Sequence, residues 1–326
     1  MQSLGFFGIF KDSFKIIFSW KKIFSQITLA LILPLSFIFL ANIEMSELFY
    51  SKFLHRHALP EIVPGTSTYY RLSNSISSKW TVFWLLFKAA YLTIILILSL
   101  LSTAAVVFTI ACIYAGKEFT FKKVMSVVPK VWKRLMVTFL WYFLVAFCYN
   151  ILVIVAFVLW YTWTSNASPG IGLTVFVLLL ILYLMGLVYM SIIWQLASVV
   201  TVLEDSYGIQ AMKRSKALVK GKMGVAIGIF LLLNLFFGGT LLTFEIFGVY
   251  AFEGIIIRMG FGIGCLLLLV WLILIGLTLQ TVLYFVCKSY HHEIIDKSSL
   301  EYRLEVYLGE YVDLKANNVQ LGECHV

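Results

Sequence analysis

The sequence predicts an all-α polytopic membrane protein with six transmembrane helices. Residues of the hydrophobic set make up 61% of the 326 residues and charged residues only 13%, whereas an ordinary soluble domain is roughly half apolar and about a quarter charged. The apolar residues form long continuous runs instead of the alternating pattern of a membrane β-barrel. Lysine and arginine are concentrated in the segments that precede the first, third and fifth apolar runs. Together these observations give the fold class and exclude an ordinary soluble domain.

Six apolar runs are long enough to cross a bilayer, because its hydrocarbon core of about 30 Å needs roughly 20 helical residues. The predicted spans are 27–45, 81–115, 136–163, 173–202, 223–247 and 259–287. They form one transmembrane domain over residues 1–287, and residues 288–326 form a cytoplasmic tail. The second run is about 52 Å long at 1.5 Å per residue, so we expect Lys88 to snorkel to the outer interface near Trp84. Pro34 predicts a kink in the first span.

The distribution of cations predicts the orientation. Segments 1–26, 116–135 and 204–222 hold fifteen Lys and Arg residues, and the intervening segments hold five. The positive-inside rule therefore places the first set, and with it both termini, in the cytoplasm. The spans then form three hairpins, each preceded by a basic segment. This threefold pattern fits an ancient triplication, and it fits equally the positive-inside rule acting on any six-span protein.

All three basic segments are predicted to form amphipathic helices in the membrane interface, one before each hairpin. In the first, an apolar face of Phe6, Phe10, Phe14, Ile17 and Phe24 lies opposite Lys11, Lys15, Ser19 and Lys22. In the second, Phe121, Val124, Val128 and Trp132 lie opposite Lys122, Lys130 and Lys133. Pro129 is expected to break the second helix, because the residue before a proline disfavours helical geometry.

The third basic segment reads "VLEDSYGIQAMKRSKALVKGK" over residues 202–222. Asp205 or Ser206 is expected to cap a helix that ends at Gly221, with Ile209 and Met212 as its apolar face. Each cation near an anionic leaflet contributes on the order of 1 kcal/mol of binding. We therefore predict lipid-headgroup contacts for ten residues, and the alternative is that these cations only set the topology. The ten are Lys11, Lys15, Lys22, Lys122, Lys130, Lys133, Lys213, Arg214, Lys216 and Lys220.

The span interiors carry amides and hydroxyls but no ionisable group in their central portions, where such groups are usually functional. Hydrogen bonds between helices account for these polar residues, and a pore or substrate path is the alternative. They are Asn150, Gln195, Asn234 and Gln280, with Ser99, Ser102, Thr103 and Ser191. The histidine pairs of "HRH" and "HHE" fall on opposite sides of the membrane. We predict no catalytic, metal or cofactor-binding site, no cofactor, no nucleic-acid partner and no enzymatic activity.

The third basic segment is similar to a motif in the membrane domain attached to some bacterial glycerophosphodiester phosphodiesterases. The matching positions are Glu204, Gly208, Ala211, Ser215, Leu218 and Gly221. The start "GIFKDSFKIIFSWKKIF" fits the same pattern. With "YAGKEFTF", "CKSYHHE" and "YLGEYVDLK", the whole chain resembles a plant family of six-span proteins without assigned activity, whose relatives sometimes carry the label polyadenylate-binding-protein-binding protein. The resemblance implies a membrane domain and no catalysis, because the bacterial catalytic residues belong to a separate soluble domain.

The predicted function follows from the basic segments and the uncharged span interiors. We expect a non-catalytic protein that organises lipid or scaffolds partners at an endomembrane or the plasma membrane. Its partners are membrane lipids, anionic phospholipid among them, and a protein that binds the tail over 288–326. The alternative is a carrier or channel for a lipid-like or neutral solute, which would use the polar residues of the spans.

Overall fold

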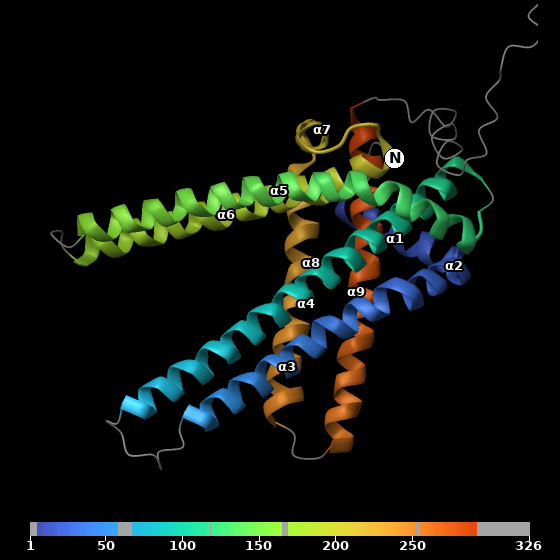
Figure 1. Cartoon of the computed structure of the whole chain (residues 1–326). Coiled ribbons are helices and arrows are strands. Elements are labelled where there is room, and N and C mark those ends of the chain that lie inside the picture. Colours follow the sequence, from blue (N-terminus) through green and yellow to red (C-terminus); the bar gives the residue numbers. More distant parts are fainter. Residues whose placement is uncertain (1–4, 58–66, 118, 165–168, 252–254, 292–326) are drawn as a thin grey trace, which may run out of the picture.

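The computed structural model describes residues 5–57, 67–117, 119–164, 169–251 and 255–291, and every regular element in these ranges is a helix (Figure 1). Long apolar runs dictate this outcome, because a helix satisfies all its backbone hydrogen bonds internally. The α-helices are α1 (Phe6–Ser19), α2 (Lys21–Ile27), α3 (Leu33–His57), α4 (Ser67–Ala115), α5 (Phe121–Thr164), α6 (Pro169–Leu203), α7 (Ile209–Val219), α8 (Met223–Thr243) and α9 (Ile255–Tyr290). Two π-helical segments are η1 (Thr28–Ile32) and η2 (Phe244–Ala251).

Six helical stretches are long and apolar enough to cross a membrane, which confirms the six predicted spans. They are Lys21–Ser46, Val82–Ala115, Phe121–Trp163, Gly172–Leu203, Met223–Phe247 and Ile256–Tyr290. Four of them begin and end within about three residues of the prediction. The first begins at Lys21 and the third at Phe121, because helix continues from the basic segment into the apolar run. The tail expected to bind a protein partner lies outside the described residues after His291.

The long helices pack in consecutive pairs, α3 with α4, α5 with α6 and α8 with α9 (Figure 1). The three pairs diverge from a common junction, and α5 and α6 extend together to one side of it. The short helices α1 and α7 lie at this junction, where the chain also begins. We call this end of the molecule the basic end, and define it as α1, α2, residues 119–135, residues 209–220, and the last turns of α6 and α9.

The main hydrophobic core extends from the basic end into the adjoining parts of the spans. Its buried residues include members of 100–112 of α4, 192–203 of α6 and 270–287 of α9, together with residues of α1, α2, α7, α8 and the start of α5. By contrast, none of the most apolar window of α5 is buried, and only 11% of that of α6. Lipid is as apolar as leucine, so helices gain little by packing together inside it. The outer parts of the spans therefore diverge without losing hydrophobic stabilisation.

The second basic segment is not a separate helix, and the prediction that Pro129 breaks it is wrong. Helix α5 runs from Phe121 to Thr164 with Pro129 inside it. A proline removes one backbone hydrogen bond, but Val124, Val128 and Val131 are buried around it and hold one helical face against the core. The pyrrolidine ring itself is exposed. Packing of the flanking turns thus outweighs the missing bond.

Pro34 is accommodated by a change of helix type. The π-helical segment η1 ends at Ile32, two residues before Pro34, and the N–H of Leu33 donates to the carbonyl of Thr28, five residues back. A π-turn widens the helix and shifts the hydrogen-bond pattern by one residue, which suits a position where the proline nitrogen cannot donate. The first span therefore contains a π-bulge at the predicted site of irregularity.

At the opposite end from the junction, two polar contacts join α3 to its neighbours. The Lys88 amine on α4 donates to Asn42 Oδ1 and to Ser46 Oγ, both at 2.8 Å. Arg258 on α9 forms an ion pair with Glu44, with 2.7 Å between Nη2 and Oε2. Lys88 also lies 5.7 Å from the centre of the Trp84 ring. The lysine predicted to snorkel is thus bound by polar atoms of the adjacent helix.

Replacing Lys88→Met is expected to destabilise the protein, because Asn42 and Ser46 lose the donor they share. Hydrogen bonds to a charged group contribute about 1.5–3 kcal/mol each, and we expect a loss at the lower end of that range. The measurement is the thermal unfolding midpoint in mild detergent. Lys22→Met, at an exposed lysine, is the control and should leave the midpoint unchanged. Equal midpoints for both variants would contradict the assigned role of Lys88.

Candidate functional site

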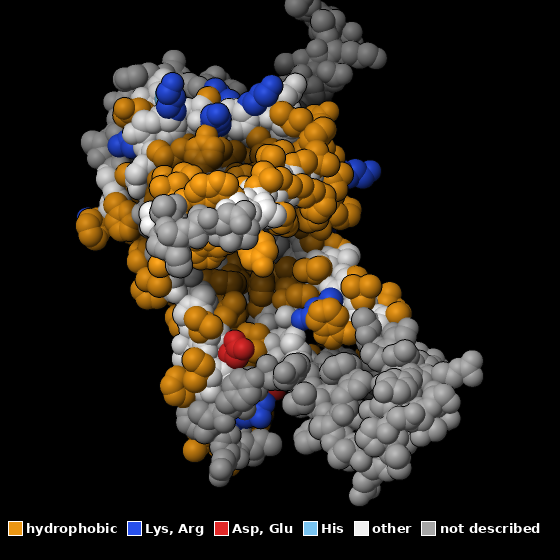
Figure 2. Space-filling model, turned by 90° about the vertical axis from the view of Figure 1, so that its left-hand side faces the viewer, with side chains coloured by type: hydrophobic (Ala, Val, Ile, Leu, Met, Phe, Trp, Pro, Cys, Tyr) orange, Lys and Arg blue, Asp and Glu red, His pale blue; other side chains and the backbone are white. Residues whose placement is uncertain are grey.

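A basic surface covers the end of the molecule where the short helices lie (Figure 2). Figure 2 shows lysine and arginine side chains gathered above a broad hydrophobic belt. Nine of the ten cations predicted to contact headgroups are exposed: Lys11, Lys15, Lys22, Lys122, Lys130, Lys133, Lys213, Lys216 and Lys220. They come from three segments far apart in the chain. The fold therefore brings the predicted site residues to one end of the molecule.

Helix α1 has a buried face and a lysine face. Ile9, Ser13 and Ile17 are buried, and α1 packs against α9. Lys11 and Lys15 are exposed. The predicted aromatic face is only partly buried, since Phe6, Phe10 and Phe14 pack at the edge of the core. Ile9, which the sequence pattern had not singled out, is fully buried.

Helix α7 is oriented differently from the prediction. Ile209, expected on its apolar face, is 39% exposed, whereas Ala211, Ser215 and Leu218 are buried. The Ser215 hydroxyl donates to the Ile193 carbonyl of α6 at 2.8 Å. Small side chains on the buried face allow the two helices to approach closely, as at helix interfaces in membrane proteins. The opposite face of α7 consequently presents its lysines outward.

The turn before α7 depends on a glycine. Asp205 and Ser206 were expected to cap α7, but its N-cap is Gly208, without a side-chain hydrogen bond. Gly208 has φ +63°, a conformation that residues with a Cβ rarely adopt. Its N–H donates to Thr138 Oγ1 of α5 at 2.8 Å, and Thr138 also lies 3.0 Å from Thr201 Oγ1 of α6. These bonds join α5, α6 and the start of α7.

Glu204, at the end of α6, is the centre of a charged network. Its Oε2 accepts from Arg214 Nε of α7 at 3.2 Å, and its Oε1 accepts from the Tyr284 hydroxyl of α9 at 2.7 Å. The Lys288 amine lies 3.4 Å from the same Oε1. The Glu204 side chain is only 15% exposed. One carboxylate therefore joins three helices.

The environment of Glu204 favours its ionised form. Burial alone would raise the pKa of this carboxyl, but the Tyr284 hydrogen bond and the positive charges of Lys288 and Arg214 outweigh it. The pKa of Glu204 consequently lies below its ordinary value of 4.5. Arg214 thus differs from the nine lysines, because its guanidinium binds Glu204 inside the junction.

The motif positions singled out within residues 202–222 correspond to this packing. The acid of the motif is Glu204, which holds three helices. Its Ala, Ser and Leu positions are buried residues of α7, and its two glycines have positive φ, +63° at Gly208 and +101° at Gly221. The motif therefore describes how α7 packs against α6, and none of its side chains forms part of the exposed lysine surface.

Sequence reasoning missed two members of the network, Tyr284 and Lys288. Nothing in the local pattern near residue 284 marks a partner for an acid eighty residues earlier. A tyrosine and a lysine one turn apart at the end of a span are the only available signal. Among the described residues, no three His, Cys, Asp or Glu side chains are close enough to hold a metal ion. The contacts that the structure describes around Glu204 are ion pairs and hydrogen bonds.

Replacing Gly208→Ala is expected to destabilise the protein by about 1–3 kcal/mol, the cost of holding a non-glycine residue in a rare backbone conformation. The new Cβ would also lie 3.0 Å from Trp141 Cδ1. Gly224→Ala is the matched control, because Gly224 lies in α8 and a methyl group added there would have no heavy atom within 4 Å. The control should be neutral or slightly stabilising. Thermal unfolding in detergent compares the two, and a larger loss at Gly224 would contradict the assignment.

Replacing Glu204→Gln is expected to lower stability at neutral pH by about 2 kcal/mol or more, because Arg214 and Lys288 lose their counter-charge. The pKa of Glu204 is lower in the folded state, so the ionised carboxylate stabilises the protein fully above pH 4.5. That stabilisation is lost as the pH falls through the lower folded-state pKa. The difference in unfolding midpoint between wild type and variant should therefore shrink below pH 4.5. A difference that is constant from pH 7 to pH 3 would exclude the ionic role.

Comparison with known proteins gives one match. Residues 1–324 match the family described as Domain of unknown function (DUF8558). No curated protein and no solved structure matches the chain.

Proposed function

We propose that this chain, which belongs to the DUF8558 family, is a membrane protein whose basic end binds the anionic headgroups of the cytoplasmic leaflet. The observation that carries the proposal is the gathering of nine exposed lysines from α1, α2, α5 and residues 213–220 at one end of the molecule. Binding there would organise lipid around the protein or hold it as a scaffold for partners. No catalytic step is part of this role.

The orientation supports this proposal. Fifteen Lys and Arg residues lie in the three segments that form the basic end, against five in the intervening segments. By the positive-inside rule the basic end and both termini are cytoplasmic. The cytoplasmic leaflet carries the anionic lipids, so the charges of protein and membrane are complementary. We place the protein in the endomembrane system or the plasma membrane, with α1 and α7 lying in the interface.

The energetics favour binding by the lysines together. A single lysine near an anionic surface contributes on the order of 1 kcal/mol, and salt screens the attraction beyond about 8 Å at physiological ionic strength. Nine such side chains on rigid helices therefore sum to a substantial affinity without a specific pocket.

A second candidate is a carrier for a lipid-like or neutral solute. The observation that favours it is a cavity between the spans that is lined by amides, with a volume of about 240 Å³. A carrier requires this cavity to open alternately to the two sides of the membrane, which tests the candidate directly. Transport of a neutral solute into sealed vesicles would favour it over the scaffold.

The test of the first proposal is native mass spectrometry of the full-length protein with equal phosphatidylserine and phosphatidylcholine. We expect selective retention of phosphatidylserine. The combined variant Lys213→Gln, Lys216→Gln and Lys220→Gln should lower it by on the order of tenfold or more at low salt. These lysines are exposed, and Arg214 is left intact because it pairs with Glu204.

The matched control replaces the same three lysines with arginine, which keeps the charge and should keep the retention. Equal retention of both lipids by the wild type would exclude the proposal. So would unchanged selectivity in the glutamine variant, because the cations of α7 would then only set topology.

A further inference from the structure

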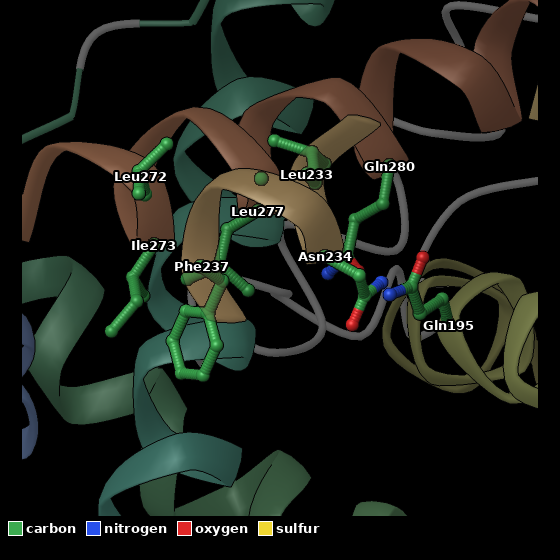
Figure 3. A pocket seen from close by; sticks show the side chains of 9 residues that line it. Gln195, Leu233, Asn234, Phe237, Leu272, Ile273, Leu277 and Gln280 are labelled. Atoms are coloured by element: carbon green, nitrogen blue, oxygen red, sulfur yellow. The ribbon is translucent and has the colours of Figure 1, made fainter. Parts of the chain in front are cut away.

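A cavity of about 240 Å³ opens between α6 and the α8–α9 pair, within the membrane-spanning stretches (Figure 3). Three of its lining residues are amides from three different helices: Gln195 of α6, Asn234 of α8 and Gln280 of α9. Figure 3 shows their amide groups gathered at one end of the cavity. The remaining lining is aliphatic or aromatic, including Leu233 and Phe237. The cavity is thus polar at one end and apolar along the rest.

The amides have hydrogen-bonding capacity to spare. Asn234 Nδ2 donates to the Phe230 carbonyl of its own helix at 2.8 Å. The side chains of Gln195 and Gln280 have no hydrogen-bond partner among the residues that the structure describes. Each primary amide offers two donors and two acceptor lone pairs. Leaving such groups without partners in an apolar medium costs several kcal/mol, so a polar ligand here would be favoured.

The amides lie near mid-depth in their spans. Gln195 is eight residues before the end of its span at Leu203, Asn234 eleven after Met223, and Gln280 ten before Tyr290. At 1.5 Å per residue these positions are about 12–17 Å from the basic end of each span, in a hydrocarbon core of about 30 Å. None of the residues lining the cavity is ionisable. A charged headgroup would find no counter-charge at this depth, so the ligand is uncharged.

Gly276 of α9 helps to shape the cavity, because a side chain at this position would extend into it. A Cβ added to Gly276 would meet only Leu233 Cδ1, at an ordinary contact distance of 3.7 Å. A methyl group therefore fits, whereas a longer side chain would fill the space in front of the amides. This residue offers a way to block the cavity without altering its polar groups.

We propose that this cavity binds the hydroxyl- or ester-bearing end of a neutral lipid, with the amides on its polar end and the apolar lining along its hydrocarbon. The amides donate to ester or hydroxyl oxygens and accept from a hydroxyl hydrogen. Diacylglycerol and sterol both present this chemistry. The site is separate from the basic end and takes uncharged lipid, which distinguishes it from the proposed binding of anionic headgroups; it names the ligand class of the cavity that a carrier would use.

The test uses the full-length protein in phosphatidylcholine nanodiscs with three photoactivatable probes: diacylglycerol, a sterol and phosphatidylcholine. Labelled peptides are located by mass spectrometry. We expect diacylglycerol or sterol to label residues 233–237 and 272–280 at least fivefold more than phosphatidylcholine does. Preferential labelling by diacylglycerol identifies the ester-bearing glycerol end as the ligand, and preferential labelling by the sterol identifies the hydroxyl.

Two kinds of variant assign the labelling to the cavity. The double variant Gln195→Leu and Gln280→Leu removes the spare hydrogen-bonding groups, and Gly276→Leu fills the space. Each should lower the labelling to the level of the phosphatidylcholine probe. Gly238→Leu is the control on α8, because a Cβ added there would have no heavy atom within 4 Å, and it should label like wild type. A thermal unfolding midpoint close to that of the wild type shows that each variant is still folded.

The proposal is overturned if neither neutral probe labels these residues more than phosphatidylcholine does. It is also overturned if both kinds of variant label like wild type, since the amides would then be satisfied by water or by each other. Loss of phosphatidylserine selectivity with the neutral labelling intact would contradict only the proposed function. The two hypotheses therefore fail separately.

Discussion

The carboxylate of Glu204 is the interaction on which the arrangement of the basic end depends. It lies where α6 ends, and it binds Arg214 of α7 together with Tyr284 and Lys288 of α9. Four residues later, the N–H of Gly208 binds Thr138 and so adds α5 to the same junction. Without these bonds α7 would be a short exposed helix, and an isolated helix of eleven residues is marginal in water. Polar contacts therefore determine where the apolar spans converge.

The core lies where the surroundings of the helices change from hydrocarbon to water. At the basic end the spans leave the hydrocarbon, and burying apolar surface away from water again becomes favourable. Phe24, Leu135 and Tyr284 are almost fully buried there, in a core to which several helices contribute. Inside the bilayer, lipid solvates apolar side chains, and the exposed surfaces of α5 and α6 need no protein partner. The diverging pairs in Figure 1 are consistent with this change of solvent along each helix.

Sequence reasoning predicted the spans because length and hydropathy are local properties. It failed where the outcome depends on contacts between distant segments. Pro129 lies inside a helix because buried valines on either side support α5, and a dipeptide rule does not contain that packing. Ala211 and Ser215 form the buried face of α7 because their small side chains let the helix pack closely against α6. A pattern based on large apolar residues selected Ile209 for that face instead. The sequence pattern grouped Arg214 with the lysines because it does not show the pairing with Glu204. That carboxylate lies in the turn before α7, and its other partners, Tyr284 and Lys288, are far away in the sequence on α9.

The two faces of α7 explain why so apolar a protein has a cationic helix between two spans. Its small residues fix the helix against α6, its arginine neutralises a carboxylate in the junction, and its lysines are left to face outward. The nine exposed lysines are thereby gathered at the basic end, whereas the polar groups lining the cavity at mid-depth are neutral amides. This division follows from the cost of polar groups, because an ion is expensive in hydrocarbon and a neutral amide far less so. A charged headgroup is consequently suited to the basic end, and an uncharged lipid is suited to the cavity at mid-depth.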